Sequence, residues 1–285
     1  MNAVLADLIH VLQLEQLEIN LFRGASRDLG FPQVFGGQVL GQSLTAASAT
    51  VASDRSVHSL HAYFLLPGDV TAPIIYEVDR SRDGGSFSSR RVVAIQHGQP
   101  IFHMSASFQV SQQGLEHQSM MPVVPAPDTL PDLHQLVAQS TDVPAELKRW
   151  FQIPLPVEFR AVSAEQLMSS HPSEASTQFW FRAVDRLPDE AVLHRSVLAY
   201  ASDFYLLRTS TQPHGIPFPN AHLRLASIDH AMWFHRPLRV DEWLLYCIDS
   251  PSASGARGLS RGAIYDQTGA LVASVAQEGL IRYTS

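Results

Sequence analysis

The chain has 285 residues, a hydrophobic fraction of 45% and a formal net charge of −7 at pH 7. This length allows one large domain or two of about 140 residues, and the acidic balance argues against nonspecific binding to nucleic acid. No apolar run approaches the ~18 residues of a membrane span. The N-terminus lacks the basic region of a secretion signal. Cys247 is the only cysteine, which favours a reducing compartment and hence a cytoplasmic protein.

The first half predicts two helices and several strands. A helix is expected through about Leu14, followed by a strand over 17–23. Gly36 and Gly37 allow a close turn, and apolar residues then recur at helical spacing from Val39 to Ala47. Small residues fill much of this second helix, which would let a sheet wrap closely around it. Strand-like runs follow at 57–66, 73–80, 86–96 and 100–110, with a hairpin turn at 97–99.

The composition changes in a connecting segment that contains Pro122, Pro125, Pro127, Pro131, Pro144, Pro154 and Pro156. Prolines at this density interrupt any long helix or strand. We interpret residues 112–156 as a crossing linker between two domains, with a short helix near 133–137.

The second half repeats the first in element order. Strands are predicted at 157–161 and 177–183, a helix from His194 to Arg208, and further strands at 222–235, 242–248, 256–265 and 270–282. Individual residues match as well, because Tyr76, Asp79 and Arg91 correspond to Tyr246, Asp249 and Arg261 at an offset of 170 that becomes 171 after the turn at Gly98 and Gly269. A shared order with a nearly constant offset indicates an internal repeat.

The helix from His194 to Arg208 carries a single acid, Asp203, in an almost wholly apolar run. A carboxylate in apolar surroundings is unfavourable unless it has partners or its pKa shifts, and this is the usual setting of a catalytic carboxylate. The alternative is a structural acid that is hydrogen-bonded inside the core or at the end of the helix.

A sheet wrapped around one long helix, occurring twice in a chain, is the hotdog arrangement. Here the resemblance to a known family becomes specific, because DLGFPQVFGGQVLGQSL, VHSLHAYFLLPGD, ASIDHAMWFHRP and LVASVAQEGLIR together resemble the acyl-CoA thioesterase II family. Members of that family are double hotdogs, so the resemblance implies an α+β fold with two repeats, residues 1–111 and 157–285, on either side of the linker. It also implies hydrolysis of acyl-CoA thioesters to a free fatty acid and CoA.

The resemblance also implies a three-residue site. Asp203 corresponds to the family's catalytic aspartate, Gln277 to its catalytic glutamine, and Ser227 to a position that is commonly threonine. Serine keeps the hydroxyl but loses the methyl group that restrains χ1. In chemical terms, a carboxylate can take a proton from water while neutral groups hold that water over the thioester carbonyl.

Two points of this chemistry stay open. Asp203 is expected to act as a base, but it could instead attack the carbonyl directly and form a mixed anhydride. The oxyanion needs backbone N–H groups, for which the turn at Gly36 and Gly37 and the entry to the second central helix are the candidates.

Only the second repeat carries this set of residues. The residue that corresponds to Gln277 at offset 171 is Ala106, and the one that corresponds to Ser227 at offset 170 is Val57. The helix of the first repeat contains no acid between Gly41 and Ala47. We therefore expect the first repeat to lack catalysis of its own.

Other polar residues are weaker candidates. His58 is a secondary candidate near the site, with a hydrogen-bonded structural histidine as the alternative. Arginines with neighbouring glycines suit the phosphates of CoA because of their fixed fork of donors; those considered are Arg90, Arg91, Arg257 and Arg261. The histidines lack the spacing of a metal site, so neither a metal nor a cofactor is expected. Cys247 lies in an apolar run and is interpreted as a packing residue.

Three functions are compatible with these observations. The first is an acyl-CoA thioesterase. The second is another hotdog enzyme, such as a hydratase or dehydratase, which needs a histidine close to the acid; His194 is too far along the helix to share a turn with Asp203. The third is a noncatalytic acyl-CoA-binding protein. No G-x-S-x-G motif supports an α/β-hydrolase. The edges of hotdog sheets invite pairing, so a homodimer or homotetramer is expected.

Overall fold

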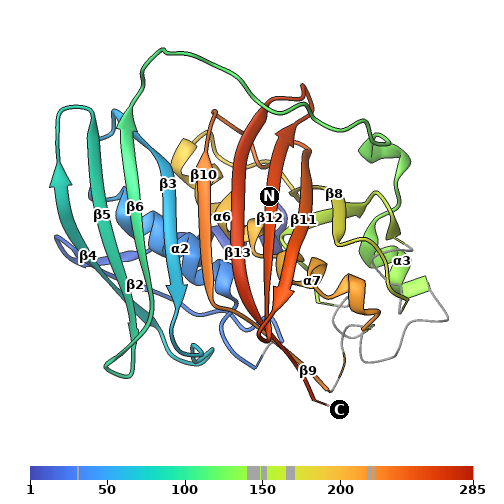
Figure 1. Ribbon diagram of the computed structural model, residues 1–285. Helices are drawn as coiled ribbons and strands as arrows, with labels where there is room; N and C mark the ends of the chain where they lie inside the picture. Colours follow the sequence, from blue (N-terminus) through green and yellow to red (C-terminus); the bar gives the residue numbers. More distant parts are fainter. Residues whose placement is uncertain are drawn as a thin grey trace.

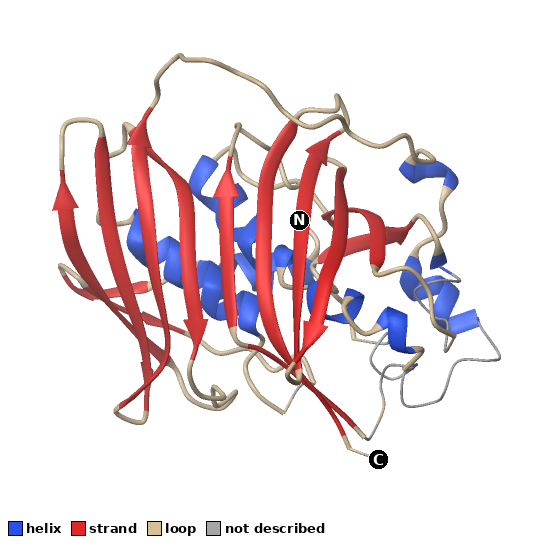
Figure 2. Cartoon of the chain, viewed as in Figure 1, coloured by secondary structure: helices blue, strands red, loops and turns tan. Residues whose placement is uncertain are grey.

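The computed structural model describes residues 1–30, 32–139, 148, 153–164, 171–216, 220 and 222–284. One curved antiparallel sheet dominates it, with the strand order β1-β2-β4-β5-β6-β3-β10-β13-β12-β11-β8-β7 and with β9 paired to β13. The two central helices, α2 (Gly36–Ser48) and α6 (Ala191–Ser202), both lie against the same face of this sheet (Figure 2). The architecture is therefore α+β, as predicted.

The first repeat has the predicted elements with one exception. Its bounds are α1 (Ala3–Leu12), β1 (Glu15–Glu18), β2 (Leu21–Gly24), α2, β3 (Arg55–Phe64), β4 (Ile74–Asp83), β5 (Phe87–Gln96) and β6 (Gln99–Val110). The single strand predicted over 17–23 is wrong, because the chain reverses there between β1 and β2. Asn20 holds the turn, since its carbonyl accepts the N–H of Val78 (2.9 Å) and its side chain accepts a hydrogen bond from Arg80 (2.8 Å).

The second repeat follows the same order with two breaks. Its bounds, with those of the linker, are η1 (Pro127–Thr129), α3 (Leu133–Gln139), β7 (Val157–Ala161), β8 (Ser176–Ala183), α6, α7 (Leu206–Thr209), η2 (Gln212–His214), β9 (Leu223–Ser227), β10 (Asp229–Phe234), β11 (Leu244–Ser254), β12 (Arg257–Asp266) and β13 (Leu271–Tyr283). The helix predicted from His194 to Arg208 is divided, and the strand predicted over 222–235 is divided at Ile228. Both breaks lie at the candidate site.

The two repeats share one sheet (Figure 1). Strands β3 and β10 pair at the centre, with Leu60 opposite Met232, and the strand order then runs outward as β6-β5-β4-β2 on one side and β13-β12-β11-β8 on the other. Because corresponding strands occupy corresponding places, the molecule has the two-repeat organisation of a double hotdog.

Small residues bring the two central helices together. A Cβ at Gly37 would clash with the carbonyl oxygen of Tyr200, and one at Gly41 would lie 3.0 Å from the carbonyl oxygen of Ser196. The hydroxyl of Thr45 also donates to the hydroxyl of Ser196 at 3.0 Å. The small residues of α2 were expected to let the sheet pack closely around this helix. In the structure its glycines instead allow close packing of α2 against the backbone of α6.

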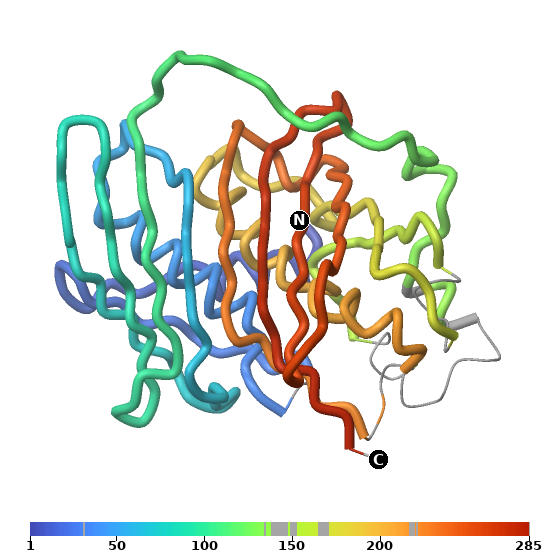
Figure 3. The backbone as a smooth tube through the Cα atoms, in the orientation of Figure 1, coloured from blue at the N-terminus to red at the C-terminus, as the bar shows by residue number. Residues whose placement is uncertain are grey.

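The linker leaves β6 and crosses the end of the sheet to the second repeat (Figure 3). The side chain of Gln118 donates to the carbonyl of Gly269 (2.7 Å), and the indole N–H of Trp180 donates to the carbonyl of Pro125 (2.9 Å). The short helix predicted near 133–137 is α3. Residues 140–147 and 149–152 of the predicted linker lie outside the described residues. In the part of the chain that the structure describes, no helix has the length and apolar character needed to cross a bilayer.

Candidate active site

Asp203 lies at the C-terminal end of α6, not within a longer helix. Helix α6 ends at Ser202, and Asp203 is its C-cap residue. The chain turns at Tyr205, whose φ of 62° is in the left-handed region, before α7 begins at Leu206. A tyrosine in this region is uncommon and costs roughly 1–2 kcal/mol, so the surrounding packing must enforce the turn. Its effect is to leave the carboxylate of Asp203 at the end of a helix.

A β-bulge presents the two other predicted residues. Ser227 in β9 is opposite Gly279 of β13, whereas Ala231 in β10 is opposite Ala276, so residues 228–230 face only residues 277–278. The extra residue produces the break at Ile228 and redirects the strand. As a result Ser227 and Gln277 both face the helices.

The structure brings the three predicted residues into one hydrogen-bonded group. The hydroxyl of Ser227 donates to Oδ1 of Asp203 at 3.3 Å. The amide nitrogen of Gln277 donates to the same hydroxyl at 2.8 Å. Gln277 is buried, with 1% of its surface exposed. Ser227 is thus placed between an amide and a carboxylate.

The N-terminus of α2 completes the surroundings of Asp203. The backbone N–H of Gly37 lowers the pKa of the Asp203 carboxylate, so it lies close to that group. A Cβ at Gly36 would lie 2.7 Å from Oδ2 of Asp203 and 3.0 Å from the ring of Phe64. Gly36 and Gly37 were predicted to form a turn, but they are the first two residues of α2. This helix end, one of the two candidates for the oxyanion donors, therefore lies directly at the carboxylate. The first repeat contributes backbone to a site whose polar side chains come from the second.

Burial raises the pKa of Asp203 above its ordinary value. Polar neighbours, among them the hydroxyl of Ser227, lower it in part. Two helix ends act in opposite directions, since the C-terminus of α6 disfavours a negative charge and the N-terminus of α2 favours one. A carboxylate with a raised pKa is a stronger base than an exposed aspartate.

His230 is a member of the site that the sequence analysis missed. Its side chain is fully buried; Nδ1 lies 2.6 Å from Oε1 of Gln277, and Nε2 lies 3.0 Å from the hydroxyl of Ser202. Burial lowers the pKa of the His230 imidazole, although the nearby carboxylate of Asp203 opposes this shift. His230 is one of the histidines whose spacing does not suit a metal site, and no other role was predicted for it from the sequence.

The strand register gives the correspondence between the repeats. In the first repeat Val57 is opposite Phe108, Leu60 is opposite Ala106, and β3 is bulged between Val57 and Ser59. The same bulge in the second repeat places Ser227 where the first has Val57. It also places His230 where the first repeat has Leu60, and Gln277 where it has Ala106. The first repeat thus has apolar residues at all three positions.

His58 is not brought to Asp203. It occupies the bulge of β3, where Nε2 lies 2.8 Å from the hydroxyl of Ser107 and the ring meets Phe87 edge-on at 5.6 Å. Burial lowers the pKa of His58. Phe64, which does contact the site, is six residues further along β3, or roughly 20 Å at the rise of an extended strand. These contacts fit the structural alternative for His58.

The four candidate arginines divide between the two faces of the sheet. Arg90 points inward with 2% of its surface exposed, and it donates to Thr50 Oγ1 (2.9 Å), to the carbonyl of Thr50 (3.0 Å) and to Asp83 (2.7 Å). The N–H groups of the Arg90 guanidinium already donate to protein acceptors, so we no longer propose that Arg90 binds the phosphates of CoA.

Arg91, Arg257 and Arg261 remain exposed. Arg257 donates to Glu278 at 2.8 Å, and Arg261 donates to Asp249 at 2.6 Å. Any phosphate that binds these two arginines would compete with a carboxylate that is already in place.

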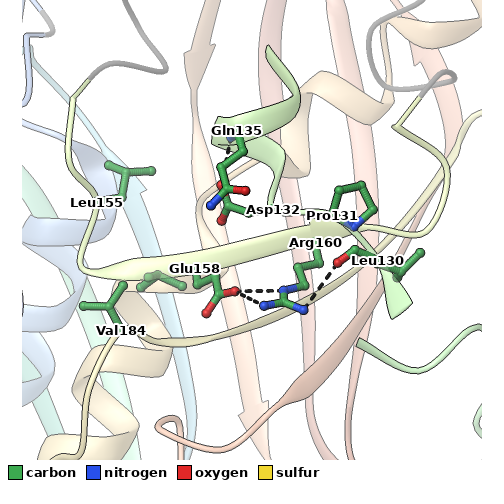
Figure 4. A pocket seen from close by; sticks show the side chains of 9 residues that line it. Leu130, Pro131, Asp132, Gln135, Leu155, Glu158, Arg160 and Val184 are labelled. Atoms are coloured by element: carbon green, nitrogen blue, oxygen red, sulfur yellow. Dashed lines mark hydrogen bonds and ion pairs between the residues drawn. The ribbon is translucent and has the colours of Figure 1, made fainter. Parts of the chain in front are cut away.

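A cavity of about 430 Å³ lies away from this site, along the edge strand β7 (Figure 4). Glu158 and Arg160 project into it and form an ion pair at 2.7 Å, while Leu155 and Val184 contribute apolar surface. No residue of the group around Asp203 lines this cavity. The candidate active site is therefore identified by its side chains and not by a cavity.

Metal and thiol chemistry find no support among the described residues. No cluster of histidine, cysteine and carboxylate side chains with the geometry of a metal site occurs in the described ranges. Burial raises the pKa of the Cys247 thiol to about 12. At neutral pH this cysteine is therefore protonated and a poor nucleophile.

Family models and known proteins that are similar to this chain all belong to one family. The family model "Acyl-CoA thioesterase" matches residues 148–280, and "Acyl-CoA thioesterase N-terminal domain" matches residues 27–109. The chain is 43% identical to acyl-CoA thioesterase 2 of Haemophilus influenzae over 100% of both chains. It is 41% identical to human acyl-coenzyme A thioesterase 8, covering 95% of this chain and 88% of the relative.

Solved structures agree with the fold. A crystal structure of an acyl-CoA thioesterase II from Mycobacterium marinum aligns with a TM-score of 0.81 at 46% identity, covering 98% of this chain and 99% of that one. A hot dog fold protein from Alicyclobacillus acidocaldarius aligns with a TM-score of 0.79 at 19% identity, covering 98% and 99% of the two chains, and supports the fold alone.

Proposed function

Since this chain belongs to the acyl-CoA thioesterase family, we propose that it hydrolyses acyl-CoA to a free fatty acid and CoA with Asp203 as the base that activates water. The observation that carries the proposal is the pair of contacts at Ser227. Its hydroxyl accepts a hydrogen bond from the amide of Gln277 at 2.8 Å and donates one to Asp203 at 3.3 Å. A base and two neutral polar groups are thereby held within reach of one water molecule.

The proposed reaction has two steps. In the first, Asp203 takes a proton from water, and the resulting hydroxide adds to the thioester carbonyl to form a tetrahedral intermediate. In the second, the carbon–sulfur bond breaks, and the proton on Asp203 passes to the CoA thiolate. The raised pKa of Asp203 suits both steps, because it makes the carboxylate a better proton acceptor and lets the neutral acid persist until the thiolate leaves.

Negative charge on the carbonyl oxygen needs stabilisation while the intermediate exists. The N-terminus of α2 faces the site, as the contacts of Gly36 and Gly37 with Asp203 indicate. The positive end of a helix stabilises a nearby anion. We therefore assign this helix end, contributed by the first repeat, to the oxyanion.

Direct attack by Asp203 is the alternative route, and it predicts a mixed anhydride. A single turnover in ¹⁸O-labelled water detects an anhydride that water opens at the aspartyl carbonyl. Activated water places the label in the fatty acid, whereas an anhydride that is opened by attack at the aspartyl carbonyl leaves label in Asp203. Incorporation into Asp203 after one turnover would refute the role of Asp203 as a base.

Hydration and noncatalytic binding are the two competing functions. Both ring nitrogens of His230 are engaged, with Gln277 at 2.6 Å and with Ser202 at 3.0 Å, which leaves neither free for a substrate proton. Free thiol measured during incubation with acyl-CoA distinguishes the three functions. Hydrolysis releases one thiol for each substrate consumed, whereas hydration and binding leave the thioester intact. Absence of thiol release would contradict the proposed activity.

The proposed roles of Ser227 and Gln277 are tested by a double-mutant cycle. Ser227→Ala and Gln277→Ala are each expected to lower kcat on the order of 10- to 100-fold, because each removes a group that holds the water. Since the two side chains act through one hydrogen-bonded contact, the double variant should lose less than the product of the two effects. Fully multiplicative losses would show that they act independently.

Substrate binding, assembly and location complete the proposal. Arg91, Arg257 and Arg261 stay candidates for the CoA phosphates, and Arg257→Gln is expected to raise KM with little change in kcat.

A cytoplasmic location is supported by the free thiol of Cys247. A homodimer or homotetramer is supported by the sheet edges at β1 and β7, and light scattering on the purified protein tests it.

A further inference from the structure

We propose that His230 is a positioning residue that fixes the amide of Gln277 and thereby directs the hydrogen of the Ser227 hydroxyl toward Asp203. This inference rests on the proposed function, because it assigns a role within the same site. The relevant contacts form one continuous series, which runs from Ser202 through His230, Gln277 and Ser227 to Asp203.

The contact between His230 and Gln277 fixes where one hydrogen lies. Nδ1 of His230 is 2.6 Å from Oε1 of Gln277, and an amide oxygen is only an acceptor. A separation this short requires a hydrogen between the two atoms, so Nδ1 must carry it. Neutral imidazole has one N–H, and Nε2 is then an acceptor for the hydroxyl of Ser202 at 3.0 Å.

The tautomer of His230 then sets the direction of every later hydrogen bond. With its oxygen held by His230, the amide of Gln277 presents Nε2 to Ser227 at 2.8 Å. The hydroxyl oxygen of Ser227 accepts this bond, and its own hydrogen is directed to Oδ1 of Asp203 at 3.3 Å. With the amide reversed, Ser227 would face the amide oxygen and its hydrogen would be drawn away from the carboxylate.

The opposite arrangement is chemically distinct. The Ser202 hydroxyl also lies 2.9 Å from the carbonyl of Ala199, and donation there would leave it to accept from Nε2–H of His230. Nδ1 would then be an acceptor, and Gln277 would have to turn its nitrogen toward it. The two arrangements therefore differ in the position of the ring hydrogen, in the orientation of the Gln277 amide and in the direction of the Ser202 hydroxyl.

The first repeat provides a matched comparison. Leu60 occupies the register position of His230, is fully buried, and lies opposite Ala106, which takes the place of Gln277. The fold thus accepts leucine at this position when no glutamine is present. The histidine and the glutamine occur together in the repeat that carries Asp203, and both are absent from the repeat that lacks it, so a purely structural need for the imidazole is not supported.

The kinetic test uses His230→Leu, which introduces the residue found at this counterpart position, together with Gln277→Ala and the double variant. Alone, His230→Leu is expected to lower kcat on the order of 10- to 100-fold, as loss of an orienting partner commonly does, with KM changed less than about threefold. In the Gln277→Ala background the same substitution should change kcat less than about twofold. An unchanged kcat for His230→Leu, or an equal loss in both backgrounds, would overturn the inference.

Two conservative variants keep the test valid if His230→Leu folds poorly. The amide nitrogen of asparagine can occupy the place of Nδ1, whereas that of glutamine occupies the place of Nε2. His230→Asn should therefore retain more activity than His230→Gln, because only the former donates to Gln277. Equal activity, or the reverse order, would overturn the inference.

A spectroscopic measurement on the wild-type protein is independent of activity. The ¹⁵N chemical shifts of the His230 ring distinguish the neutral Nδ1–H tautomer from the Nε2–H tautomer. We expect Nδ1–H at neutral pH, and the Nε2–H form would refute the proposed direction of the hydrogen bonds. If Asp203→Asn were active while His230 showed the expected tautomer, the proposed function would fail and this hydrogen-bond geometry would stand.

Discussion

Replacing Gly36 by alanine tests how tightly Asp203 is held. The added Cβ would lie 2.7 Å from Oδ2 of Asp203 and 3.0 Å from a ring carbon of Phe64. An ordinary contact between carbon and oxygen is about 3.3 Å or longer, so the carboxylate must retreat by roughly half an ångström. The backbone at Gly36 is helical and accepts alanine, whose helix propensity is the higher of the two.

The expected result is a loss of activity without a loss of stability. A displacement of about 1 Å at a reacting group can cost about 100-fold in rate, so half of that should lower kcat about 10-fold or more. The melting temperature should stay within about 3 °C of wild type, because both neighbours of the new methyl group are side chains that can rotate. Thiol release and thermal unfolding measure the two quantities.

Two other glycines serve as controls. Alanine at Gly37 would meet the carbonyl oxygen of Tyr200, a backbone atom that cannot rotate away. This variant should therefore lose about 1–3 kcal/mol of stability. Alanine at Gly85 meets no atom within 4 Å and should change neither quantity. A Gly36→Ala variant with wild-type kcat would refute the claim that the carboxylate is fixed against α2.

The remaining predictions concern ionisation and packing. Because burial raises the pKa of Asp203 in the folded protein above its value in the unfolded chain, this carboxyl group costs stability that is absent below the ordinary aspartate pKa and grows as the pH rises toward the folded-state pKa. Asp203→Asn should therefore melt higher than wild type at neutral pH, and the difference should vanish once the pH falls below the ordinary aspartate value. A pH-independent difference would contradict this reasoning. Arg90→Met should lose about 2–3 kcal/mol in denaturant unfolding, because it removes hydrogen bonds from a buried charged group, whereas Arg91→Gln on the exposed face should change less than about 0.5 kcal/mol; equal losses would show that Arg90 is not structural. Since the Cys247 thiol has a pKa of about 12, iodoacetamide at pH 8 should alkylate it slowly and leave activity intact, and rapid inactivation through this residue would be inconsistent with its burial.

The repeat was predictable from sequence because its signal is long-range. The offset of 170 to 171 residues joins many positions, and the strand register reproduces it at Val57 and Ser227 and at Ala106 and Gln277. A pattern that is spread over two repeats survives local irregularities. The same comparison contained the signal for His230, since its counterpart is Leu60, and a systematic search for positions that are polar in one repeat and apolar in the other would have found it.

Local backbone conformation was harder to predict. The apolar run around Asp203 continues to Leu207 without a proline or glycine, so helical periodicity extends through it. The helix nevertheless ends at Ser202, because Tyr205 adopts a left-handed conformation. Only tertiary packing can impose that conformation on a tyrosine, and packing is not visible in a single sequence.

Residue type alone did not show which of the candidate arginines is buried and which is exposed. Arg90 and Arg91 are adjacent on a strand and therefore face opposite sides of the sheet. The sequence shows that both cannot face one groove, but it does not show which one is inward. In the structure Arg90 points into the interior, where Thr50, two residues after the end of α2, supplies its hydroxyl and carbonyl oxygens as acceptors.

The central claim is that the carboxylate of Asp203 is the base for hydrolysis. Thiol release by Asp203→Asn, measured over a single turnover with saturating acyl-CoA, tests it most directly, because asparagine keeps the shape and an oxygen acceptor for Ser227 but cannot take the proton. We expect a folded protein whose rate of thiol release falls by about 100-fold or more. A rate within a few-fold of wild type would contradict the role of Asp203 as the base.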